Sequence, residues 1–398
     1  MFIYIIQMNF NKEYVQFRKN KKYKHQNIYD FIKEGNVFFG SGGSENIIVK
    51  MDDRSVLKIV PILEKDPNWK ENVDNNEKEI EFYKFFTKEF ILTNITPHIV
   101  GYFDNYKLLN ITKMFPKKCL TIDEKFLVNP KKLSYVNEKL CELKNMHKFK
   151  LIKNTADVIV LENCPISIGS IISRILNSKK GNKHNDLKEL LDRTIFQLIY
   201  TLTAIQHSYP TFIHNDLFLR NILGKIESEY DNNDYVEYKY NGVSYYLKAN
   251  GFYMRINDFG YSLLPPIIMS KTFYESVRFN PIDQMSFDDK LKDTFTFLYD
   301  LYNGQNLGHW SVMSYIRDED IGFKREIKKL FKKYMDVNLI DKITKYNKNL
   351  LDMQWNIKHT PLLRKTIMEP KLYFKKGTFD KYRTKPKDAN IVKTFQIN

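Results

Sequence analysis

The chain has 398 residues, of which 43% are hydrophobic and 28% charged, a composition typical of a globular protein rather than a disordered one. This length exceeds the roughly 250 to 300 residues at which single cores stop growing, so two lobes or one large bilobal domain are expected. No apolar run approaches the roughly 18 residues of a membrane span. The opening MFIYIIQMNF lacks a basic leader and a small-residue cleavage site, so we expect a cytoplasmic protein with Met8 as an alternative start.

Cysteine usage and net charge set broader limits. Cys119, Cys141 and Cys164 have no CxxC spacing and cannot all pair, which argues against a disulfide framework and a zinc site and favours a reducing compartment. The formal net charge of +16 allows electrostatic contact with polyanions or an anionic membrane, but it equally fits a lysine-rich solvated surface. The basic residues are dispersed and form no recognised nucleic-acid-binding motif.

The first 35 residues form a basic leader dotted with aromatic residues. Beyond it, VFFGSGG, NIIVKM and SVLKIVP predict strands, and the turn at Asp52 and Asp53 joins the last two as a hairpin. Residues 74–90 then repeat apolar side chains at helical spacing. This order predicts a small β-rich part with one main helix.

Further strands are predicted at Pro97–Tyr102 and Asp157–Leu161. Between them, residues from about 105 to 154 are rich in lysine and asparagine, and we interpret them as an insertion with one helix from Ser134 to Lys148. After Pro165 the pattern becomes helical, and the stripe over 186–206 is long enough to cross a large core.

Strands return after this long helix. Residues 234–240, 243–248 and 252–257 are separated by NG and ANG turns and predict a β-meander, because Asn-Gly tolerates the positive φ of hairpin turns. The remainder, from Asp293 onward, is predicted to be mostly helical and is strongly basic.

A glycine-rich turn and a strand lysine are the first candidates for chemistry. In FGSGGSENI, backbone without Cβ atoms can donate N–H groups to phosphates, although an ordinary hairpin turn has the same composition. Lys58 lies in the apolar strand SVLKIVP and needs an anionic partner, either a nucleotide phosphate or a helix glutamate, unless it snorkels from an edge strand. Glu79 has Phe82, Tyr83 and Phe86 at +3, +4 and +7, so it is expected to face inward.

Two polar motifs follow. In HNDLFLRNIL, Asp216 can accept a proton from a hydroxyl, Asn221 can hold a divalent cation through its amide oxygen, and His214 is expected to fix the loop. In INDFG, the carboxylate of Asp258 can bridge a metal ion and phosphate oxygens, with Gly260 allowing a sharp turn behind it. Each motif alone also fits an ordinary loop.

The order of glycine hairpin, strand lysine, helix glutamate, HxDxxxxN and DFG resembles the protein kinase superfamily over about residues 36–310. The resemblance implies an α+β, bilobal protein-kinase-like fold, with a small β-rich N-lobe carrying one main helix and a larger helical C-lobe. It divides the chain into a leader (1–35), an N-lobe (36–162) and a C-lobe (163–398), with the meander inserted at about 225–255.

The same resemblance implies ATP and Mg²⁺ as cofactors. It implies catalytic roles for Asp216, Lys58 and Arg220, metal binding by Asn221 and Asp258, and an anchoring role for Asp293 on a C-lobe helix. The implied ATP-binding residues are Phe39, Gly40, Ser41, Gly42, Gly43, Ser44, Ile47, Lys58, Glu79, Glu162 and Cys164, the last two through their backbone in the adenine-binding hinge beside Leu161.

Several residues differ from the usual kinase pattern, and these differences indicate which group of kinases the chain resembles. Glu45 replaces the third loop glycine, and Asn215 replaces the arginine of HRD, so activation by loop phosphorylation is not expected. Phe218 stands where serine/threonine kinases carry a lysine, whereas Arg220 lies where tyrosine kinases place the equivalent cation. Together with the lack of an APE motif, these features resemble the divergent serine/threonine-protein kinases of poxviruses and giant viruses, which implies the host cytoplasm or the virion.

The function that this resemblance implies is ATP- and Mg-dependent transfer of the γ-phosphate to serine or threonine hydroxyls of a protein substrate. Two alternatives stay open. HNDL without arginine is also similar to choline and aminoglycoside kinases, which phosphorylate small alcohols. A pseudokinase acting as a binding module is the other, although the retained Lys58, Asp216, Asn221 and Asp258 argue against it.

Overall fold

In the computed structural model, apolar strands build a five-stranded sheet in the order β1-β2-β3-β5-β4. The strands are β1 (Val37–Phe38), β2 (Ile47–Lys50), β3 (Ser55–Leu63), β4 (Tyr102–Leu109) and β5 (Ile152–Glu162). β2 and β3 pair antiparallel, which confirms the predicted hairpin. The structure describes residues 14, 37–38, 46–51, 54–64, 71–119, 135–178, 182–265, 267–268, 287–303, 311–316, 320–346 and 365–397.

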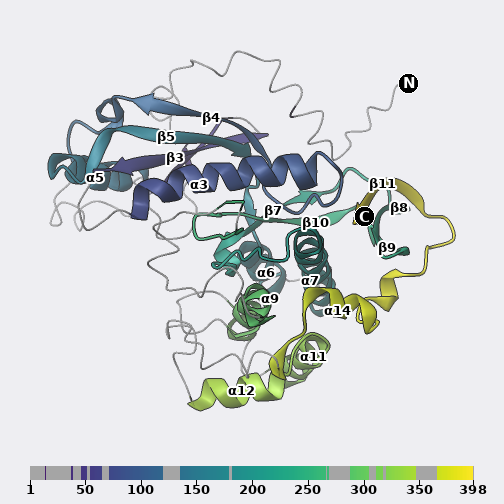
Figure 1. Cartoon of the computed structure of the whole chain (residues 1–398). Coiled ribbons are helices and arrows are strands. Elements are labelled where there is room, and N and C mark those ends of the chain that lie inside the picture. The colour runs from purple at the N-terminus through teal and green to yellow at the C-terminus, as the bar shows by residue number, and fades with distance from the viewer. Residues whose placement is uncertain are drawn as a thin grey trace.

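Helices cover both faces of this sheet (Figure 1). On one face, α5 (Tyr135–Lys148) packs its buried Leu143 with Ile47 and Ile59. On the other face, α3 (Glu71–Phe86) packs Phe82 with Ile159 and continues as a π-helical turn at Thr87–Ile91. Both predicted helices are confirmed. The face under α3 is also the face of Lys58, because Lys58 pairs across the sheet with Ile159 and cross-strand partners point the same way.

The strand expected at Pro97–Tyr102 lies elsewhere. β4 begins at Tyr102 and runs to Leu109, so it occupies the first residues of the expected insertion. Residues 97–101 bond instead to the end of the strand at 251–256: Val100 N–H donates to Ile256 O, and Ile256 N–H donates to His98 O. Sequence alone could not choose between the two partners, because strand propensity does not specify what a strand pairs with.

The expectation about cysteines is wrong for one pair. Cys119 and Cys141 form a disulfide with their Cα atoms 5.8 Å apart, which ties the segment after the 3₁₀ turn Ile111–Met114 to α5. Cys164 is free and buried. The pairing spans 22 residues and comes from the tertiary fold, so a spacing motif could not show it. Cysteine usage therefore no longer supports a reducing compartment.

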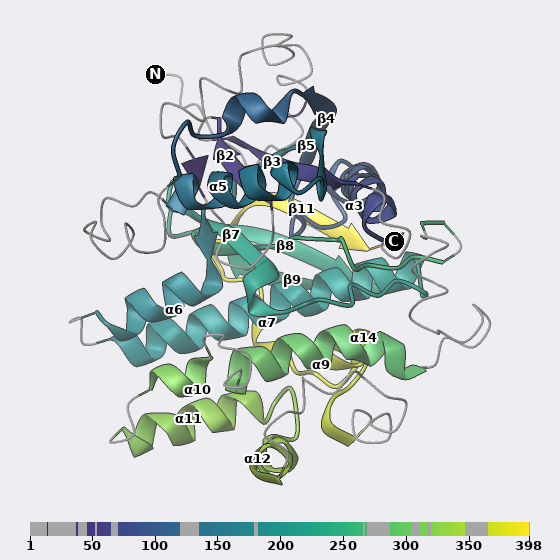
Figure 2. The same ribbon diagram turned by 90° about the vertical axis from the view of Figure 1, so that its left-hand side faces the viewer.

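Helices make up most of the C-terminal part, stacked below the sheets (Figure 2). They are α6 (Ile168–Leu176), α7 (Lys183–Ser208), α9 (Phe287–Asn303), α10 (Val312–Tyr315), α11 (Ile321–Phe331), α12 (Val337–Tyr346) and α14 (Pro370–Lys375). α7 is buried from Leu190 to Ile205 and forms the centre of this part. No helix in the described ranges has the length and apolarity needed to cross a membrane. The structure thus has the predicted α+β, bilobal architecture, β-rich above and helical below.

The predicted meander is only partly correct. β8 (Asp234–Tyr240) and β9 (Val243–Lys248) form the expected hairpin, in which Asn241 and Gly242 have φ of 50° and 74°. β10 (Gly251–Ile256), however, pairs with β7 (Ile222–Glu227), which also pairs with β6 (Ile166–Ser167). Arg193 of α7 redirects the chain by donating to Lys248 O and Asn250 O.

A C-terminal strand, absent from the sequence prediction, completes the second small sheet. β11 (Asn390–Ile397) pairs in parallel with β8, giving the order β11-β8-β9. Gln396 N–H also donates to Asn94 O just after α3, and Phe395 is buried against Tyr238. The end of the chain thereby connects the N-terminal part with the inserted hairpin.

Gly251 and Gly242 provide a matched test of the turn that separates β9 from β10. Both have positive φ, but an added Cβ would lie 2.8 Å from Nη1 of Arg193 at Gly251 and meet nothing within 4 Å at Gly242. We expect Gly251→Ala to lower the free energy of unfolding by about 2 to 4 kcal/mol and Gly242→Ala by about 1 kcal/mol, measured by urea denaturation. Equal losses would contradict the role of Arg193 in this turn.

Candidate active site

A buried lysine joins three elements beneath the five-stranded sheet. Lys58 lies in β3, Glu79 in α3, and Asp258 just after β10. Nζ of Lys58 is 2.6 Å from a carboxylate oxygen of Glu79 and 3.2 Å from one of Asp258. Lys58 and Glu79 are buried, but the side chain of Asp258 is 32% exposed, so a ligand can reach it from solvent. The structure therefore contains the Lys58–Glu79 contact that the residue pattern predicts.

The charges of this cluster favour a cationic ligand. Burial alone would lower the pKa of Lys58, but Asp258 and Glu79 raise it above its usual value and keep the amine protonated. Burial raises the pKa of Glu79 to about 7 against the opposing effect of Lys58. Burial would also raise the pKa of Asp258, but Lys58 lowers it below its usual value. When Lys58, Glu79 and Asp258 are all ionised, the cluster has a net charge of −1.

The backbone of the INDFG segment is fixed from α3. The hydroxyl of Tyr83 donates to Oδ1 of Asn257 at 2.6 Å and accepts from the N–H of Asp258 at 3.0 Å. Asp258 has φ of 64°, whereas Gly260 is absent from the described residues with positive φ. The left-handed backbone therefore lies at Asp258, and Gly260 lies in the turn behind it, which is closed by a hydrogen bond from Ser262 N–H to Phe259 O at 3.0 Å. The anchoring role of Tyr83 was not predicted, although its +4 spacing from Glu79 placed both on one helix face.

Aromatic packing holds α3 against the loop from His214 to Asn221, here called the HNDL loop. The ring of Phe259 lies 4.8 Å from that of Phe86, 5.1 Å from Tyr83 and 5.1 Å from His214. All four residues are fully buried. Because these rings fill the space between helix and loop, the packing that places Glu79 beside Lys58 also places Asp258 beside the HNDL loop.

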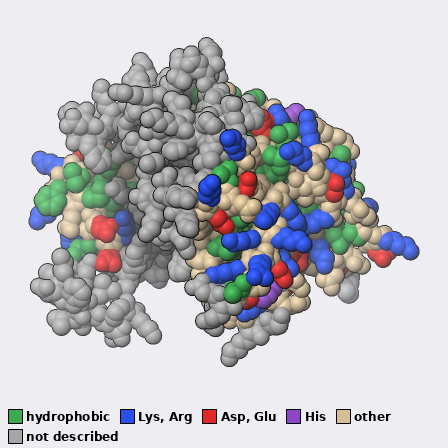
Figure 3. Space-filling view, turned by 90° about the horizontal axis from the view of Figure 1, so that it is seen from below, with side chains coloured by type: hydrophobic (Ala, Val, Ile, Leu, Met, Phe, Trp, Pro, Cys, Tyr) green, Lys and Arg blue, Asp and Glu red, His purple; other side chains and the backbone are tan. Residues whose placement is uncertain are grey.

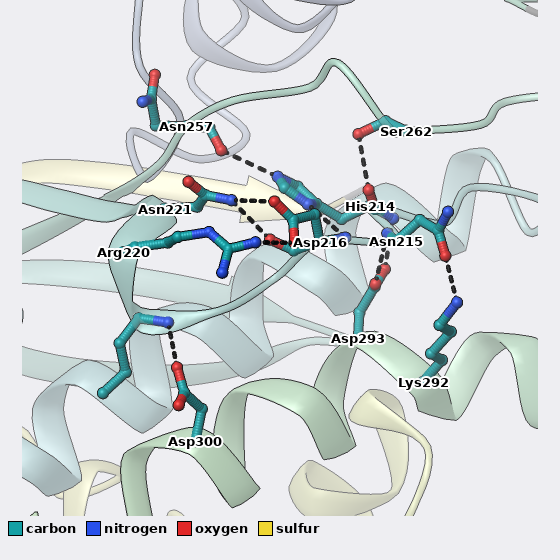
Figure 4. A network of polar contacts seen from close by, with 11 residues as sticks. His214, Asn215, Asp216, Arg220, Asn221, Asn257, Ser262, Lys292, Asp293 and Asp300 are labelled. Atoms are coloured by element: carbon teal, nitrogen blue, oxygen red, sulfur yellow. Dashed lines mark hydrogen bonds and ion pairs between the residues drawn. The ribbon is translucent and has the colours of Figure 1, made fainter. Parts of the chain in front are cut away.

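His214 is a structural histidine, as its pattern suggested. Its Nε2–H donates to Asn257 O at 3.1 Å, and its Nδ1 accepts the N–H of Asp216 at 3.4 Å (Figure 4). Burial lowers the pKa of His214, so the neutral ring is favoured. The neutral ring with one donor and one acceptor nitrogen satisfies both contacts. It links the HNDL loop to the residue that precedes Asp258.

Two carboxylates on α9 hold the backbone of the HNDL loop. Asp293 accepts the N–H groups of His214 and Asn215 at 2.6 and 2.9 Å, and Asp300 accepts the N–H of Leu219 at 2.7 Å. Asp293 thus makes the contacts expected of an anchor. Asp300 was not predicted, although the spacing of seven residues places both on one face of the helix. Burial raises the pKa of each to about 6.

Lys292 contacts Asn215, the residue at the position of the HRD arginine. Asn215 has φ of 66°, a conformation that asparagine tolerates better than most residues. Its Oδ1 accepts a hydrogen bond from Nζ of Lys292, the neighbour of Asp293 on α9. The ammonium group of Lys292 therefore holds the HNDL loop at Asn215. Sequence analysis missed Lys292, because nothing in its spacing points to Asn215.

The reactive side chains meet at the end of the HNDL loop (Figure 4). One oxygen of Asp216 is 2.5 Å from Nη2 of Arg220, and the other accepts from Nδ2 of Asn221 at 2.8 Å. The guanidinium of Arg220 stacks over the ring of Phe218, 4.6 Å from its centroid. The side chain of Asp216 is 13% exposed, so it faces the solvent side of the loop. The structure thus brings the three predicted residues together.

Asn221 and Asp258 fit a hard divalent cation. They precede β7 and follow β10 at the same end of that pair, where Asn257 N–H donates to Asn221 O at 2.9 Å. The amide nitrogen of Asn221 donates to two oxygens of Asp216, so its Oδ1 stays available to a metal. One amide and one carboxylate oxygen suit Mg²⁺, which keeps several water or phosphate ligands. Groups of three or more His, Cys, Asp or Glu with metal-binding geometry are absent from the described residues.

One predicted nucleotide contact, that of Ile47, is wrong as a side-chain contact. Ile47 pairs with Ile59 and is buried on the α5 face, away from Lys58, whereas Ile48 pairs with Lys58 and shares its face. A slip of one residue changes the face of a strand. The side chain of Glu162, whose backbone is predicted to lie in the hinge, is buried between Arg255 and Lys225 at 3.2 and 2.8 Å.

The pKa of Glu162 agrees with this structural role. Burial would raise it, but Arg255 and Lys225 lower it to about 2. Contacts of the nucleotide with the backbone of Glu162 and Cys164 stay predictions. The expected phosphate-covering residues, Phe39, Gly40, Ser41, Gly42, Gly43 and Ser44, lie outside the described residues.

Asp300 makes the stability of the protein depend on pH. Its folded-state pKa of about 6 lies above the usual aspartate value of 3.8, so its contribution to stability is full below pH 3.8 and is lost as the pH rises through 6. We expect Asp300→Asn, which keeps an acceptor for Leu219, to remove this dependence. Between pH 4 and 7 the stability of wild type should fall relative to the variant by about 1 to 3 kcal/mol, measured by urea denaturation. A constant difference would contradict the burial argument; Asp388→Asn, at an exposed site, is the control.

Comparisons with known proteins identify the family. No protein-family model matches the chain. Among solved structures, "WaaP in complex with acyl carrier protein" aligns with 77% of this chain and 93% of that chain at 9% identity, with a TM-score of 0.25. The chain is 34% identical over 402 residues to "Putative serine/threonine-protein kinase R301" of Acanthamoeba polyphaga mimivirus, covering 98% of this chain and 99% of that protein. This chain therefore belongs to the protein kinase superfamily, in the divergent group from large DNA viruses that includes the mimivirus protein.

Proposed function

We propose that this protein is an ATP- and Mg²⁺-dependent protein kinase that transfers the γ-phosphate to serine or threonine hydroxyls. The observation that carries the proposal is the convergence of Lys58, Asp216, Asn221 and Asp258 in one hydrogen-bonded site. A pseudokinase usually lacks one of these groups. The name of the mimivirus relative supports the same acceptor class.

Lys58 would place the nucleotide. Its ammonium group is held under β3 by Glu79, with Asp258 on the more exposed side. An arriving triphosphate can replace Asp258 as the anionic partner of Lys58 without moving Glu79. Asp258 is then free to bind the metal together with Asn221. Bound Mg²⁺ supplies charge neutralisation for the phosphate oxygens as transfer proceeds.

Asp216 would orient and deprotonate the acceptor. The acceptor oxygen bonds to the γ-phosphorus, the bond from that phosphorus to the β–γ bridging oxygen breaks, and the hydroxyl proton passes to Asp216. Asn221 and Arg220 hold both carboxylate oxygens of Asp216, which fixes its direction before substrate binds. Arg220 also forms an ion pair with Asp216, so it can stabilise charge on the transferred group.

Removing the proposed base should abolish transfer without abolishing nucleotide binding. We expect Asp216→Asn to lower kcat by about 100-fold to 10,000-fold while the affinity for MgATP stays near that of wild type. The measurement is transfer from labelled ATP to an unbiased protein mixture, with mass-spectrometric mapping of the phosphorylated residues. Asp231→Asn, in an exposed turn, is the matched control and should behave like wild type.

Other outcomes of this assay decide between the alternatives. If Asp216→Asn transfers phosphate at the wild-type rate, the proposed mechanism is wrong. Label found only on choline or an aminoglycoside would favour a small-molecule kinase, and a thermal shift with MgATP without any transfer would favour a pseudokinase. Phosphotyrosine as the main product would overturn the serine/threonine assignment.

Activity should not depend on phosphorylation of the segment after DFG. Asn215 offers no guanidinium to a phosphorylated loop, and Lys292 already satisfies its side chain. We expect treatment with a broad-specificity protein phosphatase to leave activity within about 2-fold of the untreated protein. Mass spectrometry of the treated sample confirms that phosphates were removed. A large loss of activity on dephosphorylation would show that another cation performs the role of the missing arginine.

A further inference from the structure

A basic cavity lies in the lower helical part, between the end of α11, the start of α12, residues 365–368 and the end of α14. Its volume is about 480 Å³, within the range of small-molecule sites. Four lysines line it: Lys332, Lys333, Lys365 and Lys376. None of the residues assigned to the active site lines this cavity. Seen from below, lysine and arginine side chains gather over the described part of this face (Figure 3).

The four lysines of this cavity have no acidic partner among the described residues. Two nearby lysines outside the cavity are paired: Lys328 lies 2.7 Å from Asp341, and Lys371 lies 2.8 Å from Glu369. The carboxylate that does line the cavity, Asp336, uses Oδ1 to accept the N–H of Leu339 at 3.0 Å. Four ammonium groups therefore share one lining carboxylate, which leaves a net charge of about +3 in the cavity.

The shape of the cavity is fixed by buried residues. Tyr334, Val337 and Ile367 are buried in its wall. Asp336 N–H donates to Thr366 O at 2.8 Å and joins two walls of the cavity. The start of α12 adds the positive end of a helix dipole to the ammonium groups. The site is thus preformed and positive before any ligand arrives.

We propose that this cavity binds a compact ligand that carries several phosphate groups. Lysine binds phosphate as a point charge from any direction, whereas planar carboxylates are recognised best by arginine, and arginine is missing from the lining residues. A charge of about +3 matches a ligand with two or more phosphates better than a single carboxylate. A soluble polyphosphate and the headgroup of a phosphoinositide share this chemistry.

The experiment is isothermal titration of the full chain with inorganic tripolyphosphate. We expect Lys332→Gln/Lys365→Gln to bind at least about 10-fold more weakly than wild type. The matched control is Lys329→Gln/Lys375→Gln, which removes two exposed lysines, on α11 and α14, that do not line the cavity, and it should bind like wild type. Any binding in the catalytic site is common to all three proteins, so it cancels in the comparison.

Sedimentation with phosphatidylcholine vesicles, with and without phosphatidylinositol bisphosphate, distinguishes the two sources of phosphate. Co-sedimentation that is lost in Lys332→Gln/Lys365→Gln assigns the site to a lipid headgroup, and tripolyphosphate binding without co-sedimentation assigns it to a soluble ligand. The proposal fails if wild type binds neither probe, or if the cavity and control variants lose affinity equally. These lysines are exposed, so their substitution should not unfold the protein.

Discussion

The buried ion pair between Lys58 and Glu79 is the constraint on which the candidate site depends. A lysine in the interior of an apolar sheet must find an anion, because an unpaired buried charge would cost several kcal/mol. That requirement draws α3 against β3 and brings Asp258 within 3.2 Å of the same ammonium group. One residue of β3 therefore fixes the relation between the sheet, the helix and the segment after β10.

On the lower side of the site, buried carboxylates also need partners, and here the partners are backbone N–H groups. Asp293 and Asp300 are buried on α9, and each accepts hydrogen bonds from N–H groups of the HNDL loop. A loop without regular structure needs such partners for its backbone groups. Asp216 is thus held by a fixed backbone, while Arg220 and Asn221 orient its side chain. The positioning of Asp216 is therefore what this site would contribute to phosphate transfer.

The fold was predictable where local pattern decides it. Apolar periodicity gave α3, α5 and α7, and the Asn241–Gly242 turn gave the β8–β9 hairpin, because these depend on neighbours in sequence. Partner choice was not predictable. β10 pairs with β7 across the inserted hairpin, and β11 returns from the end of the chain to β8. Such contacts depend on which edges remain open once other elements have packed, and that information is not local.

By itself, the sequence determined the residue types and their order: Lys58, Glu79, the HNDL loop and the INDFG segment are legible because their chemistry requires particular side chains at set spacings. Only the tertiary structure decided which face each side chain occupies. In the structure, Ile47 faces away from Lys58, and Glu162 forms an ion pair with Arg255. Asp300 and Lys292 form hydrogen bonds with the HNDL loop. Cys119 and Cys141 form a disulfide. The physical reason is that direction and partnership arise from long-range packing, which a linear pattern does not encode.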